Sequence, residues 1–196
     1  MGEPVRYQPA SEFDTGWQMA IALAQHVQSG GSPSVQPSSI MLGQDERQHG
    51  QMPFEYLRFF GMDVEYSTNY LWVGGPLLGA ATMAASAIGN SNRKAQAEAM
   101  ARPQWRAFGT RATIVTNHRL LIMFEGQWVS FYHEHLIQMR PEPREWHVVL
   151  MHEGAHALML RGPWAPWLCV LIYALRYGTP WQPGVDYRTI FGITGS

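Results

Sequence analysis

Two segments of the chain share one plan, and together they restrict the fold more than any other feature. In "LLIMFEGQWVSFY" (120–132) and "VVLMHEGAHALML" (148–160), an apolar run is followed by one residue of any type, then by Glu-Gly, and then by a second apolar run. A glycine between two apolar runs favours a tight turn between paired strands. The repeated plan therefore predicts two β-hairpins of one antiparallel meander.

The second segment supports an alternative, because His152-Glu153-Gly154-Ala155-His156 fits the pattern H-E-x-x-H. On a helix this spacing places two imidazoles on one face beside a carboxylate, which is how zinc hydrolases hold their metal. However, Gly154 inside a helix costs about 1 kcal/mol relative to Ala. No His or Glu follows His156 as a third ligand, although His133 and His135 lie upstream. We interpret the segment as a hairpin without metal or other cofactor, and we keep a zinc-dependent hydrolase using His152 and His156 as the alternative.

The N-terminal part, residues 1–28, is predicted to form a helical appendage. Ser11 and Asp14 have the spacing of a capping box, and Phe13, Trp17, Ile21 and Ala24 recur at helical spacing on one face. That face must cover the main domain or a partner. Residues 29–39, "SGGSPSVQPSS", are typical of a Gly/Ser/Pro linker.

The segment 40–68 has short apolar runs broken by polar residues and glycines, which favour two or three short strands. The next 20 residues, 70–89, carry no charge, and their length would allow a transmembrane span. Their Ala and Gly residues, and Pro76, instead favour a small-residue helix. With the charged residues that follow, this inserted helix is predicted to cover 76–102.

From Arg106 onward the pattern is that of strands, followed by one apolar helix that Gly178 ends. The tail 179–196 is Gly/Pro-rich and is predicted to be irregular. Strands with helices segregated from them predict an α+β domain over 40–178.

Composition excludes several classes of function. Hydrophobic residues make up 46% of the chain, charged residues 15%, and the net charge is −1, so nothing favours nucleic acid binding. The N-terminal residues do not resemble a secretory signal, and the single cysteine, Cys169, forms no internal disulfide. We therefore expect a cytoplasmic protein in which Cys169 is a core residue, and we keep association with a membrane as an alternative.

Charge is distributed unevenly along the chain. Residues 69–119 carry one acidic and six basic residues, whereas residues 1–68 carry eight acidic and three basic residues. A stretch of this kind predicts either a solvated surface or a binding patch for an anionic partner. The candidate binding residues are Arg93, Lys94, Arg102, Arg106, Arg111 and Arg119.

The chain resembles bacterial PH-like domains of the GRAM type. The resemblance is carried by "TNHRLL" (116–121) after a β-run, by a Trp in the next strand, and by "LMLRGPWAPWLCVLIYALRYG" (158–178) as a closing helix. The resemblance is clearest over about 76–178. The chain is particularly similar to uncharacterised actinobacterial proteins. It implies a bent antiparallel sheet or barrel of about seven strands closed by a C-terminal helix, here with an added N-terminal helix and the inserted helix.

The resemblance implies binding and carries no catalytic residues over to this chain. We therefore expect a non-enzymatic interaction module that recruits a protein partner, or that binds an anionic ligand or membrane surface. Oligomers are expected to form, if at all, through the N-terminal helix or the helix 76–102.

Overall fold

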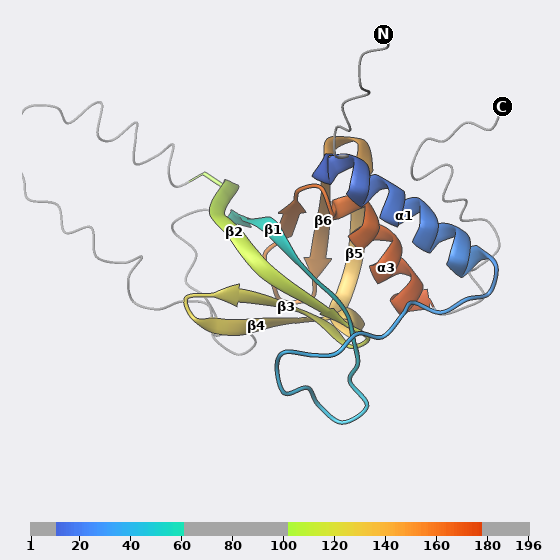
Figure 1. Ribbon diagram of the computed structural model, residues 1–196. Coiled ribbons are helices and arrows are strands. Elements are labelled where there is room, and N and C mark those ends of the chain that lie inside the picture. Colours follow the sequence, from blue (N-terminus) through green and yellow to red (C-terminus); the bar gives the residue numbers. More distant parts are fainter. Residues whose placement is uncertain (1–10, 61–101, 178–196) are drawn as a thin grey trace, which may run out of the picture.

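The computed structural model describes residues 11–60 and 102–177 of the chain (Figure 1). These residues form two α-helices, seven strands and two short 3₁₀ turns. In chain order they are α1 (Glu12–Gln28), β1 (Gln48–Phe60), β2 (Gln104–Thr116), β3 (Arg119–Phe124), β4 (Gln127–Tyr132), η2 (His133–His135), β5 (Leu136–Glu142), η3 (Pro143–Glu145), β6 (His147–His152), β7 (Leu158–Arg161) and α3 (Ala165–Tyr177).

The seven strands form one antiparallel sheet in the order β4-β3-β2-β1-β7-β6-β5. β1 joins its two halves, because it pairs with β2 along its length and with β7 over Glu55–Arg58. Figure 1 shows the sheet curled, with the helices gathered on one side. The prediction of an α+β fold with a bent antiparallel sheet and a C-terminal helix is confirmed at this level.

The prediction of two or three short strands over 40–68 was wrong for the described residues. The segment forms one strand of 13 residues, β1, in place of several short strands. Pro53 lies within this strand, where, among the described residues, β1 pairs with β2 alone. Proline has no N–H donor, but it is tolerated at this position because no described strand needs a hydrogen bond from β1 on the side away from β2.

Both predicted hairpins are confirmed. β3 and β4 are joined by Glu125 and Gly126, whose φ angles of 49° and 79° are those of a tight hairpin turn. β6 and β7 also pair, and Gly154 in their connection has a φ of 66°.

The core fills the concave face of the sheet and is closed by α3. Phe54, Leu120, Phe131 and Leu150 point inward from four strands, and α3 is buried over most of its length. Cys169 lies in this helix, where burial raises the pKa of its thiol. Its predicted place in the core is confirmed.

The capping box of α1 is present. The Ser11 hydroxyl accepts from the Asp14 N–H at 3.1 Å, and the Asp14 carboxylate accepts from the Ser11 N–H at 3.2 Å. The linker at 29–39 contains no helix and one isolated bridge, between Gln36 and Gln48.

The expected buried face of α1 is confirmed at Ala24 and by Trp17, which packs against the core, but it was wrong at Phe13. The buried residues are Gly16, Ala20, Ala24 and Val27, whereas Phe13 is exposed. Small side chains let α1 lie directly against α3 and the turn before it, and a Cβ on Gly16 would collide with the Pro163 carbonyl. Phe13 instead contacts the edge of Trp146, with ring centres 4.7 Å apart.

The predicted helix 76–102, the uncharged stretch 70–89 and the tail 179–196 fall, apart from Arg102, outside the described residues. Within the described ranges 11–60 and 102–177, neither helix has the length and apolar character that a membrane crossing requires.

Replacing Gly16 with Ala is expected to destabilise the protein by about 1–3 kcal/mol, because the added methyl group forces α1 away from Pro163. In an isolated helix the same change is favourable by about 1 kcal/mol, so a loss reports the helix contact. Urea unfolding measures the effect. Ala22→Met, at an exposed position of α1, serves as the control. A Gly16→Ala protein as stable as the parent would contradict the close approach.

Candidate functional site

The H-E-x-x-H segment lies on a hairpin. His152 ends β6, and His156 lies in the connection before β7. The turn is held by the Glu153 N–H, which donates to the His135 carbonyl at 2.8 Å, and by the Ala155 N–H, which donates to the His152 carbonyl at 3.2 Å. The two imidazoles therefore share no helical face. Among the described residues, no three His, Cys, Asp or Glu side chains form a group that could hold a metal ion.

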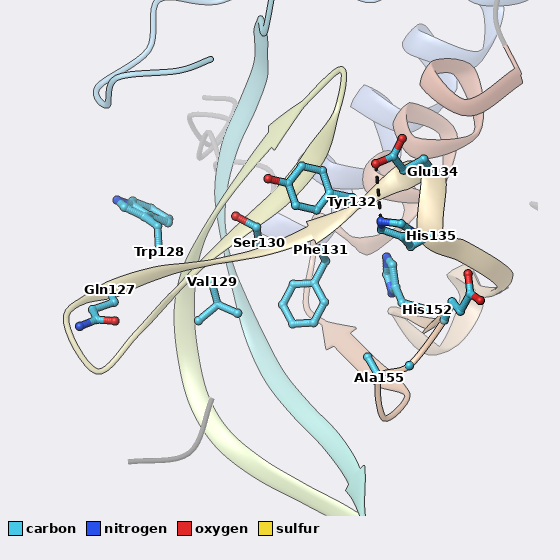
Figure 2. Close-up of a pocket in the computed structure, with 12 residues that line it drawn as sticks. Gln127, Trp128, Val129, Ser130, Phe131, Tyr132, Glu134, His135, His152 and Ala155 are labelled. Carbon is cyan, nitrogen blue, oxygen red and sulfur yellow. Dashed lines mark ion pairs between the residues drawn. The ribbon is translucent and has the colours of Figure 1, made fainter. Parts of the chain in front are cut away.

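A cleft of about 600 Å³ lies where the sheet does not close, between β4 and the connection after β6 (Figure 2). Val129 and Phe131 point from β4 toward the side where His152 and Ala155 lie, whereas Ser130 and Tyr132 point to the other side. Glu134 and His135 stand at its rim and form an ion pair at 3.5 Å. The volume lies in the range of small-molecule sites.

His152 is the most unusual side chain of the cleft. It is only 6% exposed, and neither ring nitrogen has a hydrogen-bond partner. Burial, together with electrostatic interactions with His133 and Arg58, lowers the pKa of His152 to about 4. The ring is therefore neutral at pH 7, with one donor and one acceptor unused.

Arg119, one of the predicted binding residues, instead joins the start of β3 to the loop before β1 through Glu46. Its Nε and Nη2 donate to the two oxygens of Glu46 at 2.8 and 2.9 Å, and its Nη1 donates to the Ser130 hydroxyl at 2.9 Å. Burial alone would raise the pKa of Glu46, but hydrogen bonds from Arg119, Gly43 and Thr116 lower it to about 2.

Its neighbour Asn117 fastens the same loop. The Asn117 side-chain oxygen accepts from the Arg47 N–H at 2.7 Å, and its amide donates to the Asp45 carbonyl at 3.1 Å. The Thr-Asn-x-Arg run at 116–119 thus clamps the loop that precedes β1.

The remaining predicted arginines do not join Arg119. Arg106 lies near the start of β2 and Arg111 near its middle, whereas Arg119 begins β3. The guanidinium groups of Arg106 and Arg111 lie 5.2 Å from the ring centre of Phe60 and 5.6 Å from that of Phe124. Arg102 is exposed just before β2. Arg93 and Lys94 fall outside the described residues.

Sequence reasoning missed Arg58, which stands in β1 within the apolar run "EYLRFF". It is only 9% exposed, its Nη1 donates to the Tyr56 hydroxyl at 2.9 Å, and its guanidinium lies 5.4 Å from the centre of the Phe131 ring. A lone charged residue inside an apolar run was the signal that could have identified it, since arginine is seldom buried without a partner.

A second hollow lies along the other edge of the sheet, between β5 and α3. Its volume is about 230 Å³. Ile137, which is 71% exposed, and the exposed Tyr177 lie along it. The Arg176 guanidinium donates to the Leu136 carbonyl at 3.3 Å and so ties the helix to the strand.

Comparisons with models of protein families, with curated proteins and with solved structures find no match for this chain.

Glu46→Gln is expected to lower stability at pH 7 by about 1–3 kcal/mol, because it removes one partner of a charge-assisted pair. The pKa of Glu46 is depressed from 4.5 to about 2, so its contribution is present above pH 4.5 and is lost as the pH falls toward 2. Urea unfolding at several pH values should therefore show parent and variant converging below pH 4.5. Glu145→Gln, at an exposed carboxylate, is the control, and a constant difference at all pH values would contradict the assignment.

Proposed function

We propose that this chain is a PH-like, non-enzymatic interaction module that recruits a partner protein through the hollow between β5 and α3. The observation that carries the proposal is an exposed apolar side chain, Ile137, on a strand that, within residues 11–60 and 102–177, pairs on one side only, with β6. The curled sheet and the C-terminal helix support the PH-like assignment, as does the resemblance of the sequence.

The fitting partner is an extended peptide segment with apolar side chains at alternate positions. An edge strand offers free backbone N–H and C=O groups, and an added strand pairs with them. The apolar side chains of Ile137, Tyr173 and Tyr177 then provide the contacts that select a sequence, because alternate residues of the added strand face them.

The proposed binding surface is apolar and lies beside β5, whereas the sequence led us to expect a patch of basic residues. Arg119 is paired with Glu46, and Arg106 and Arg111 lie over aromatic rings. These placements favour a protein partner over an anionic membrane. The membrane remains a distinct outcome of the test, in which salt and charge reversal at Arg102 or Arg106 would weaken binding to anionic vesicles.

The test is to select peptides that bind the full chain from a displayed random library, and then to map the strongest by amide chemical shifts. The peptides are expected to perturb the β5 amides. Ile137→Asp should weaken binding about tenfold or more, because it places a charge on the contact surface. Met41→Asp is the matched control, since Met41 is apolar and 97% exposed in the segment before β1.

Two results would overturn the proposal. One is that Ile137→Asp and Met41→Asp bind the selected peptides as tightly as the parent does. The other is that no peptide binds while vesicles containing anionic lipid bind in a salt-dependent manner.

A further inference from the structure

The interior of the curled sheet contains a buried positive charge, Arg58, that has no counter-ion among the described residues. The Tyr56 hydroxyl accepts from Arg58 Nη1, but the Arg58 Nε–H is buried and has no acceptor. In the part of the chain that the structure describes, no carboxylate lies within ion-pair distance of Arg58. Removing a guanidinium from water without an anion is unfavourable, so the arrangement requires compensation.

His152 and Arg58 both lie close to the ring of Phe131. The centres of the His152 and Phe131 rings are 5.6 Å apart, and the Arg58 guanidinium lies 5.4 Å from the centre of the Phe131 ring. His152 lines the cleft and has two unpartnered nitrogens, of which the neutral ring protonates one. Two buried donors without acceptors are therefore gathered around the Phe131 ring, of which His152 lines the cleft and Arg58 reaches the same ring from β1.

The walls of the cleft add an apolar surface. Val129 and Phe131 face into it from β4, and Gly154 and Ala155 line it from the turn after β6. Aliphatic and aromatic groups of this kind bind the body of a small organic molecule, while a few polar groups fix its orientation.

We propose that the cleft is a binding site for a small organic carboxylate, whose charged group accepts hydrogen bonds from Arg58 and His152 and whose apolar body lies against Val129 and Phe131. The guanidinium fork matches the geometry of a carboxylate. The single charge of a carboxylate matches that of Arg58, and because Glu134 and Glu153 also line the cleft, the second charge of a phosphate dianion would be unfavourable. The site lies at the β4 side of the sheet, apart from the hollow beside β5, and it does not depend on the peptide site.

The experiment uses the full chain labelled with ¹⁵N and four probes, namely acetate, benzoate, octanoate and indole-3-acetate. At least one is expected to bind saturably, shifting the amides of Phe131, His152 and Gly154. When benzoate binds, benzamide, which has the same shape and no charge, should bind about tenfold more weakly or worse. Inorganic phosphate should compete poorly.

Arg58→Gln should abolish the preference for the carboxylate, while Arg140→Gln, which removes the same charge from an exposed position on β5, should preserve it. Because Arg58→Gln could impair folding, the parent protein supplies a second measurement. The Arg58 ¹⁵Nε–H and the His152 ring nitrogens should shift on addition of the bound carboxylate.

The proposal is overturned if none of the four carboxylates binds, or if benzamide binds as well as benzoate. It is also overturned if the Arg58 and His152 side-chain signals stay unchanged at saturation, or if phosphate binds more tightly than every carboxylate. None of these outcomes bears on the peptide site, because Ile137 and Tyr177 take no part in this one.

Discussion

The fold depends on the pairing of β1 with strands from both ends of the domain. β1 is hydrogen-bonded to β2 on one side and to β7 on the other, although β7 begins some hundred residues further along the chain. The Glu55–Arg161 ion pair crosses the same junction. Because a sheet joined in this way twists and curls, its concave face encloses a core that a single helix, α3, can close.

Among the residues that the structure describes, β4 and β5 are the edge strands of this curled sheet, and the two proposed sites lie beside them. β4 borders the cleft that contains His152, and β5 borders the hollow against α3. The polarity of the concave face also changes along the sheet. Near α3 the face is apolar, whereas toward the end of β1 it carries Arg58 and Arg106.

Much of the local structure could be predicted from the sequence because it is decided by near neighbours. The turn at Glu125 and Gly126, the capping box at Ser11 and the hairpin around Gly154 all rest on short-range geometry. The buried face of α1 could not be predicted in the same way. Large residues such as Phe13 appeared to define it, but the close approach of α1 to Pro163 selects the small side chains of Gly16 and Ala20.

The candidate site was predicted less well than the fold. The expected basic residues were grouped by their closeness in the sequence, yet Arg119 lies at the other end of β2 from Arg106. Arg58 was not considered, although it and His152 come together from strands that are distant in the chain.

By itself the sequence determined the hairpins, the capped helix and the α+β class, since each depends on periodicity and turn chemistry within a few residues. Only the tertiary structure decided which arginine is paired, which is buried, and what His152 faces. Those properties depend on contacts between strands far apart in the chain, and strand pairing, not proximity in sequence, determines them.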